Sequence, residues 1–138
     1  MPQPEGTPAT TGPRTIAVGD VHGHSAALRS LVEAISPRPT DTMVFLGDLI
    51  DRGPDSKGVI DLVLALEKQC TVVPLMGNHE EMLLGAIDSP SGLDFWMKFG
   101  GKEALQSYGV DRPQQLPAEH IVFIMSAGAQ TPPLKGAS

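Results

Sequence analysis

Residues 42–54, with the sequence TMVFLGDLIDRGP, contain the pattern that decides the fold of this chain. The segment begins with a short apolar run, Thr42–Leu46, whose composition is typical of a buried strand. Polar side chains follow Gly47 directly, and the first of them is the carboxylate of Asp48. A surface pair of Asp48 and Arg52 would account for the charges, but not for their position directly after a buried strand. The segment therefore predicts a strand whose end presents functional side chains.

The same order of strand, loop and helix occurs three times along the chain. Apolar runs at Arg14–Val18 and Thr71–Leu75 also precede glycine-containing loops. Pro74 removes a hydrogen-bond donor from the last run, which indicates the end or the edge of a sheet. This alternation predicts an α/β fold made of βαβ units. Ligand sites in such sheets lie beyond the carboxyl ends of the strands, where all three loops fall.

Helical periodicity separates the three runs. Ser25–Ile35 has apolar residues at helical spacing, and Ser25 is a plausible N-cap. A second helix is expected over residues 55–68 and a third over residues 78–87. The apolar side of the second helix comprises Val59, Ile60, Val63 and Leu66.

The later part of the chain has weaker patterns. Leu93–Phe99 and Lys102–Tyr108 resemble short helices, whereas Pro117–Met125 could form a helix or a strand, because periodicity cannot assign its short apolar run. We expect one domain over residues 14–125, with flexible tails at residues 1–13 and 126–138.

Composition narrows the class of protein. A chain of 138 residues supports one domain with its own core, and its net charge of −6 argues against a nucleic-acid polymer as ligand. The single cysteine, Cys70, fits a reducing compartment. The N-terminus lacks the apolar core of a signal peptide, and no apolar run approaches the roughly 20 residues of a membrane span. We therefore expect a cytoplasmic protein without a membrane partner.

The loop after the first strand, Gly19–Gly23, has the sequence GDVHG. Asp20 and His22 are two residues apart on an extended segment, so both side chains can point to one side and hold one cation. A carboxylate and an imidazole suit Mn²⁺, Fe²⁺ or Zn²⁺. The alternative is an ordinary polar turn, because short strings of Asp, His and Gly are common.

The other two loops carry residues of the same chemistry. Asp48 could bridge two metal ions, and Arg52 offers a planar fork for two phosphate oxygens. The third loop, Gly77–Glu80, has the sequence GNHE, in which Asn78 supplies a neutral oxygen ligand and His79 a proton donor. Asn78 could equally serve as a helix N-cap, and that role does not conflict with metal binding.

Together the motifs GDVHG, GDLIDRG and GNHE resemble the signature of the calcineurin-like metallophosphoesterases, in particular the phosphoprotein phosphatase branch. The resemblance covers about Thr15–Val110. It implies the N-terminal half of an α-β-β-α sandwich, with the motifs at the carboxyl ends of the strands, and hence a chain truncated at its C-terminus. It also implies a hydrolase that cleaves phosphoric monoesters by in-line attack of a metal-bound hydroxide.

The resemblance also implies roles for individual residues. Asp20, His22 and Asp48 would hold the first of two divalent ions, with manganese favoured over iron or zinc. Asp48 and Asn78 would hold the second ion. The catalytic set would be His79 as general acid, Asp51 as the residue that orients it, and Arg52 as the phosphoryl ligand, and Asn78 would also contact substrate.

One departure from the family pattern concerns the second metal. The family completes that site with two later histidines and adds a further arginine, but after His79 this chain has only His120. His120 is expected to be a surface or helix-end residue. Ser126–Gly128 resembles a family His-Ala-Gly turn in which Ser replaces the histidine, and His24 is expected to line the cleft or to begin a helix. The sequence therefore predicts an incomplete second site.

Three functions remain open. The first is a phosphatase acting on a phosphorylated protein or a small phosphoester. The second is a symmetrical dinucleoside tetraphosphatase. The family resemblance implies that these enzymes often lack an acidic residue at the position of Asp51, which argues against this function. The third is an inactive metal-binding fragment, with an uncovered sheet face that favours self-association.

Overall fold

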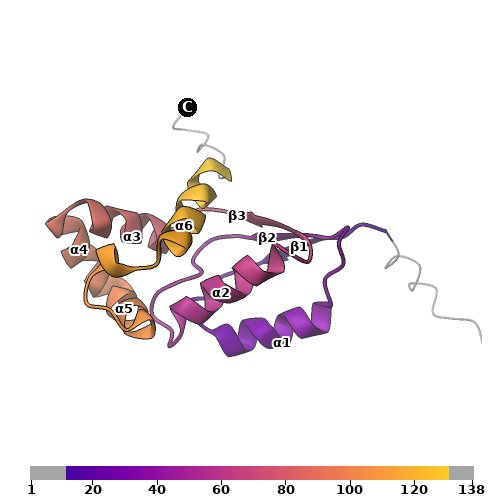
Figure 1. Ribbon diagram of the computed structural model, residues 1–138, viewed down its shortest axis with the longest axis horizontal. Coiled ribbons are helices and arrows are strands. Elements are labelled where there is room, and N and C mark those ends of the chain that lie inside the picture. Colours follow the sequence, from indigo (N-terminus) through magenta and orange to yellow (C-terminus); the bar gives the residue numbers. More distant parts are fainter. Residues whose placement is uncertain (1–11, 131–138) are drawn as a thin grey trace, which may run out of the picture.

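Three short parallel strands carry the three apolar runs. A computed structural model describes residues 12–130 and places β1 (Thr15–Val18), β2 (Thr42–Phe45) and β3 (Thr71–Pro74) in the order β1-β2-β3. Thr42 is in register with Thr15 on one side and with Thr71 on the other. The predicted α/β layer is thus confirmed, and Pro74 is the last residue of an outer strand (Figure 1).

A helix follows each strand, as expected. These are α1 (Ser25–Ile35), α2 (Ser56–Leu66) and α3 (Asn78–Asp88). The first two lie side by side below the sheet in Figure 1. Asp55 caps α2 by accepting a hydrogen bond from the backbone N–H of Gly58 at 2.9 Å. The α2 helix ends two residues before the predicted boundary at residue 68.

Two predicted N-caps are wrong. His24 holds the cap position of α1, while Ser25 is its first residue and donates its hydroxyl to Asp55 at 2.6 Å. Gly77 holds the cap position of α3, so Asn78 is the first residue of that helix. Both polar side chains are therefore free of the backbone bonds expected of a cap.

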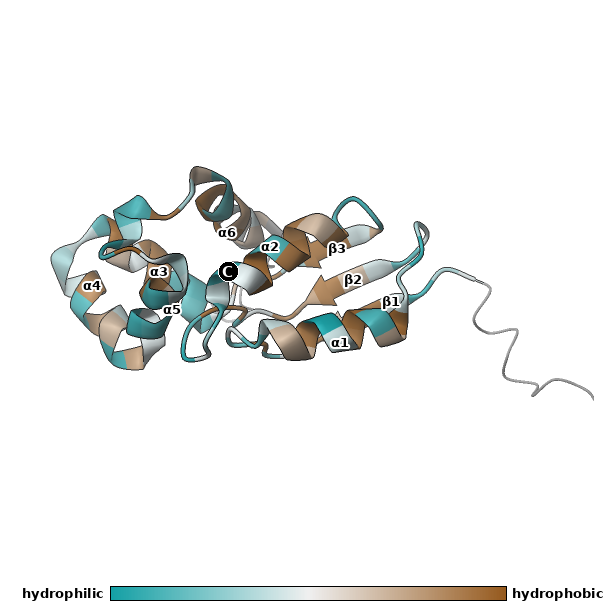
Figure 2. Ribbon diagram, turned by 60° about the horizontal axis from the view of Figure 1, so that its bottom comes forward, coloured by the Kyte–Doolittle hydropathy of each residue, from teal (hydrophilic) through white to brown (hydrophobic). Residues whose placement is uncertain are grey.

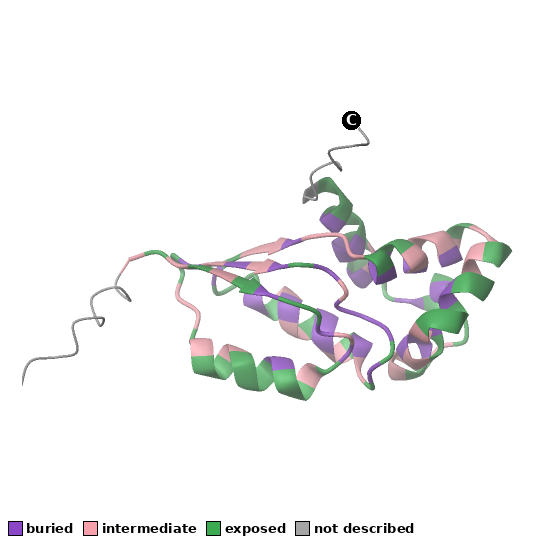
Figure 3. Ribbon diagram, turned by 180° about the vertical axis from the view of Figure 1, so that it is seen from behind, coloured by how far each residue is buried: buried purple, intermediate pink, exposed green. Residues whose placement is uncertain are grey.

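The core lies between the sheet and the helices on one face. Met43 and Phe45 on β2 are fully buried, whereas Val44 between them faces the other way and is half-buried. The predicted apolar side of α2 packs against this face, and all four of its residues have no exposed surface (Figures 2 and 3). These residues are Val59, Ile60, Val63 and Leu66.

The opposite face of the sheet is less covered. Ala17 is exposed, Val44 and Val73 are half-buried, and Leu46 just beyond β2 is 50% exposed. Parallel sheets are normally covered on both faces, so this apolar face is one on which another surface could pack. Self-association through it stays a prediction.

A helical segment follows α3. It comprises α4 (Pro90–Trp96), the kinked turn η2 (Met97–Gly101), α5 (Lys102–Tyr108), the short η3 (Pro113–Gln115) and α6 (Ala118–Gln130). Gly100, with φ 105°, interrupts the helical backbone between α4 and α5. None of the helices within the described part of the chain is long and apolar enough to cross a membrane.

The structure assigns the ambiguous segment Pro117–Met125 to a helix. The α6 helix continues through Ser126 to Gln130, so the expected start of a flexible tail at residue 126 falls inside α6. Most of the two predicted tails, residues 1–11 and 131–138, lies outside the described residues.

Arg14, Arg38 and Asp41 form an ionic cluster beside the amino ends of β1 and β2. Arg14 donates to both carboxylate oxygens of Asp41, at 3.1 and 2.6 Å, and the backbone N–H of Arg38 donates to the same side chain at 2.7 Å. Asp41 is fully buried. The hydrogen bonds from Arg14 hold the pKa of the Asp41 carboxyl well below its ordinary value.

We expect Asp41→Asn to lower the urea midpoint of unfolding at pH 7. Because the folded pKa is depressed, ionised Asp41 contributes stability above its unfolded pKa of about 4, and this contribution is lost as the pH falls below that value. The urea midpoints of the variant and the parent should therefore converge as the pH is lowered below about 4. The exposed carboxylate of Asp111 provides the control, since Asp111→Asn should leave the midpoint unchanged.

Candidate metal and phosphate site

The three loops meet at the carboxyl ends of the strands. Asp20, His22 and Asp48 each place a ligand atom within 4.8 Å of the others. In the described part of the chain this is the only group of three or more carboxylate, imidazole or thiol side chains at such distances. The structure thus brings together the three residues predicted for the first metal ion.

His22 is oriented for binding an ion. Its Nδ1 donates to the carbonyl oxygen of Ile50 at 3.0 Å, which leaves Nε2 as the free acceptor, 3.8 Å from a carboxylate oxygen of Asp20. A ring held this way, with two carboxylates beside it, fits a borderline divalent ion.

Hydrogen bonds between the loops fix the cluster. The backbone N–H groups of Val21 and His22 both donate to the carbonyl oxygen of Asp48, at 3.1 and 3.0 Å. Gly53 packs so closely under this contact that an added Cβ would lie 1.9 Å from the His22 carbonyl oxygen. Backbone packing, and not only side-chain chemistry, therefore requires glycine in the second motif.

Several site residues have left-handed backbones, which is uncommon for residues other than glycine. The φ angles are 43° at His22, 54° at Asp48, 76° at Asp51 and 72° at Arg52. Such strain costs about 1–3 kcal/mol per residue and persists only where the surroundings impose it. Its concentration in two loops supports a functional role for them.

Glu80 is a site residue that the sequence interpretation missed. Its side chain is 1% exposed and accepts three backbone hydrogen bonds, from Gly77 at 2.9 Å, Asp48 at 2.7 Å and Leu49 at 2.8 Å. It therefore ties the third loop to the second and holds Asp48 in place. The motif contains Glu80, but only the fold reveals that its partners lie 31 and 32 residues away.

Asp51 and His79 form a buried pair. The Nδ1 of His79 lies 2.9 Å from Oδ2 of Asp51, and the indole of Trp96 donates to the same oxygen at 2.6 Å. An indole can only donate, so Oδ2 accepts from Trp96. When Nδ1 of His79 donates to the same oxygen, Nε2 faces away from Asp51. Burial raises the pKa of Asp51 to about 8 and lowers the pKa of His79.

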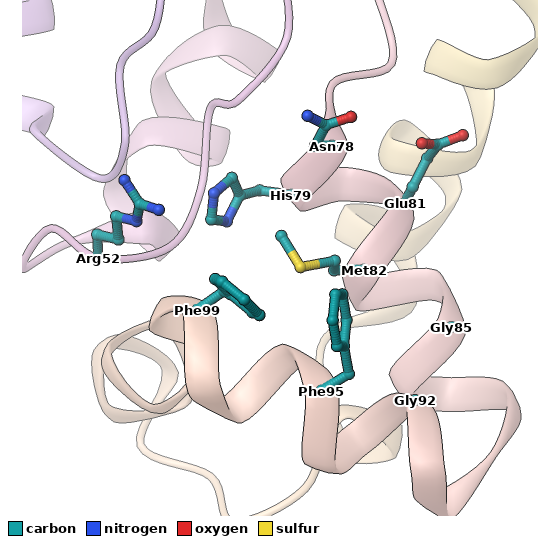
Figure 4. A pocket seen from close by; sticks show the side chains of 9 residues that line it. All are labelled: Arg52, Asn78, His79, Glu81, Met82, Gly85, Gly92, Phe95 and Phe99. Atoms are coloured by element: carbon teal, nitrogen blue, oxygen red, sulfur yellow. The ribbon is translucent and has the colours of Figure 1, made fainter.

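Arg52 and Asn78 stand at one end of a cleft of about 560 Å³. The backbone N–H of Arg52 donates to the carbonyl oxygen of Gly100 at 3.1 Å, and an added Cβ at Gly100 would lie 2.6 Å from the Arg52 side chain. The kink in η2 thus supports the arginine. Figure 4 shows the side chain of Arg52 reaching toward the ring of His79, and both residues line this cleft.

The remaining histidines lie apart from this cluster. His120 lies at the start of α6, the second of its two expected positions, but it is 3% exposed and not on the surface. Its Nδ1 lies 2.6 Å from the hydroxyl of Tyr108 and its Nε2 lies 2.8 Å from Asp61. His24 begins α1, one of its two expected positions. Ser126–Gly128 is helical and forms no ligand turn.

A parallel sheet that ends in a carboxylate–imidazole cluster, next to an Asp–His pair and an arginine, defines a metal-dependent phosphoesterase architecture. The chain belongs to the calcineurin-like phosphoesterase family, whose family model matches residues 13–128. Its sheet and helices correspond to the N-terminal half of the metallophosphoesterase sandwich.

Curated relatives come from two enzyme groups. The chain is 42% identical over 85 residues to serine/threonine-protein phosphatase 1 of Salmonella typhimurium, a match that covers 61% of this chain and 37% of that protein. It is also 42% identical over 72 residues to a symmetrical bis(5'-nucleosyl)-tetraphosphatase of Photorhabdus laumondii, covering 51% of this chain and 26% of that protein. The chain therefore spans well under half the length of these relatives.

Solved structures agree on the fold. A metallophosphoesterase from Sphaerobacter thermophilus has a TM-score of 0.50 and 25% identity, with 81% of this chain and 40% of that chain covered. A cold-active protein-tyrosine phosphatase of a psychrophilic Shewanella has a TM-score of 0.62 at 23% identity, covering 83% of this chain and 37% of that chain. At this identity the second likeness concerns the fold alone.

Trp96→Phe is expected to slow catalysis without weakening metal binding. Phenylalanine keeps most of the buried ring but removes the donor to Asp51, so His79 loses part of its orientation. Changes of this kind behind a functional side chain typically cost about 10–100-fold. The rate of phosphate monoester hydrolysis and the affinity for Mn²⁺ would be measured on one preparation, and a parallel loss of both would contradict the assigned role.

Proposed function

We propose that this chain carries the catalytic half-site of a metal-dependent phosphomonoesterase of the protein phosphatase type. The observation that supports this most is the position of the Asp51–His79 pair beside the Asp20, His22 and Asp48 cluster. The mixed carboxylate and imidazole ligands suit a divalent transition metal, and we expect Mn²⁺ first and iron or zinc next, as the family resemblance implies. A cytoplasmic location, with a phosphorylated protein or a small phosphoester as substrate, completes the proposal.

We assign the side-chain roles as the family resemblance implies, and the contact between Asp51 and His79 supports them. Arg52 binds phosphoryl oxygens through its planar fork. Divalent ions, when bound, supply positive charge to the phosphoryl group and lower the pKa of water. Protonated His79, with Nδ1 donating to Asp51, carries a second proton on Nε2 and gives it to the leaving-group oxygen as the bond to phosphorus breaks. Asn78, at the start of α3, would hold the second ion through its side-chain oxygen and would contact the substrate.

A second candidate is a module that holds one metal ion without catalysis. It is favoured by a specific observation: the described residues contain one cluster of three ligands, and the family's second site would have only Asp48 and Asn78. The less covered face of the sheet, on which another surface could pack, also fits a metal-binding module. The dinucleoside tetraphosphatase is less favoured, because we expect such enzymes often to lack the acidic residue that this chain has as Asp51, buried beside His79.

Hydrolysis of p-nitrophenyl phosphate with and without Mn²⁺ tests the proposal. The wild-type chain should show metal-dependent turnover, and His79→Ala should reduce it by about 10²–10⁴-fold, the usual contribution of a general acid. His24→Ala is the matched control, because His24 is exposed and makes no side-chain capping bond. Binding of one Mn²⁺ without turnover would favour the one-metal module instead.

A further inference from the structure

The cleft beside His79 has an apolar far end. Its lining passes from Arg52 and His79 to the side chains of Met82, Phe95 and Phe99. Figure 4 shows Met82 and the two phenylalanine rings converging in front of His79, while Glu81 points away from them. The two rings lie 4.9 Å apart, centroid to centroid.

Both rings are partly exposed to solvent. The chain has four phenylalanines; Phe45 and Phe123 are buried, whereas Phe95 is 53% and Phe99 is 40% exposed. Both exposed rings belong to the segment around η2, which also supports Arg52 through Gly100. Apolar groups left in contact with water beside polar groups are typical of a ligand subsite.

A glycine in the middle of α3 keeps the cleft open. Asn78, Met82 and Gly85 lie on one stripe of the helix, at spacings of four and three residues. An added Cβ at Gly85 would meet no atom within 4 Å, although glycine inside a helix costs about 0.5–1 kcal/mol relative to alanine. Close packing therefore does not require this glycine, and a side chain longer than Cβ at this position would enter the space that the cleft occupies.

The charges at the cleft indicate which group enters it. Among the described residues that line it, Arg52 is the only arginine or lysine, and His79 serves as the proton donor, so a chain of several phosphates would find no second guanidinium or ammonium partner. His79 protonates the leaving group in the proposed mechanism, so that group must extend from phosphorus past Nε2, toward the rings.

We propose that this cleft receives the aromatic leaving group of an aryl phosphate monoester, so that a tyrosine phosphate side chain is bound in preference to a serine phosphate side chain. The proposal rests on the proposed function, because it assumes that the phosphoryl group binds at Arg52. Burial of a ring against Met82, Phe95 and Phe99 supplies the preference.

Binding of two phosphonates, which are not hydrolysed, tests the subsite apart from catalysis. In the presence of Mn²⁺, calorimetry should show that phenylphosphonate binds about tenfold or more tightly than methylphosphonate, as expected for burial of an aromatic ring. Phe99→Ala should reduce this ratio to about threefold or less. Met97→Ala is the control, because Met97 is exposed in the same turn but lines a different surface, and it should leave the ratio unchanged.

Gly85→Leu is a second variant that should not harm folding, because leucine favours helix more than glycine does. It should fill the cleft and abolish the preference for phenylphosphonate while methylphosphonate still binds. Equal affinities for the two phosphonates in the wild type, no binding of phenylphosphonate at millimolar concentration, or an unchanged ratio in both variants would overturn the subsite. If the chain hydrolyses phosphate monoesters in a metal-dependent way but binds the two phosphonates equally, the subsite is refuted and the proposed function is not. If it prefers phenylphosphonate but hydrolyses nothing, the proposed function is refuted and the subsite is not.

Discussion

Asp48→Asn should weaken Mn²⁺ binding by on the order of 100-fold or more, since changes even to groups behind the metal ligands cost about 10–100-fold. The substitution removes a negative charge from the cluster of Asp20, His22 and Asp48 with little other change. Asparagine tolerates the left-handed backbone at this position, where φ is 54°. Its side-chain oxygen can also still accept the bond that the backbone N–H of His79 donates to Asp48 at 3.0 Å.

Isothermal titration with Mn²⁺ and hydrolysis of p-nitrophenyl phosphate measure the two consequences of this substitution. Both affinity and turnover should fall together, because the same charge serves both. Asp94→Asn changes an exposed carboxylate on α4 and should alter neither. Turnover that survives Asp48→Asn would refute the assignment of the site.

Glu80→Ala should destabilise the fold by about 3 kcal/mol or more, because it leaves three buried or partly buried backbone N–H groups without their acceptor and each costs about 1–3 kcal/mol. Gly77, Asp48 and Leu49 provide those donors. Glu80→Gln should destabilise the fold less than Glu80→Ala, because the amide oxygen of glutamine can still accept hydrogen bonds. Part of the loss should remain, because the NH₂ group would face one of the three N–H donors and cannot accept from it.

Urea unfolding of the metal-free chain measures this effect. Glu81→Ala is the matched control, because Glu81 is the neighbouring residue with the same side chain in an exposed position, and its loss should change stability by less than about 0.5 kcal/mol. Similar losses for both variants would mean that the buried hydrogen bonds of Glu80 contribute little.

Much of the fold could be predicted because its signals are local. A short apolar run followed by glycine and a carboxylate marks each of the first two strand ends within a few residues, and the helix of residues 56–66 has its buried side at regular spacing. The position of the three loops at one edge followed from the rule that parallel strands present their carboxyl ends together, and the grouping of Asp20, His22 and Asp48 followed from the family resemblance.

The missed features depend on contacts far apart in the sequence. Trp96 reaches Asp51 across 45 residues, and Glu80 reaches the backbone of Asp48 across 32. The burial of His120 was missed because a histidine at a helix end gives no sign of partners such as Tyr108 and Asp61. The helix over residues 118–130 could not be distinguished from a strand, because its apolar run is short and its burial depends on packing beside β3.

The location of bound Mn²⁺ tests the central claim, that the ends of the three strands form a divalent metal site. Mn²⁺ broadens NMR signals of nearby nuclei, so a titration of the ¹⁵N-labelled chain maps the ion directly. We predict loss of the amide signals of Asp20, His22 and Asp48 at substoichiometric Mn²⁺, with the signals of Arg14 and Asp41 at the other end of the sheet retained. Broadening centred on exposed acidic residues elsewhere, or no selective broadening, would contradict the account.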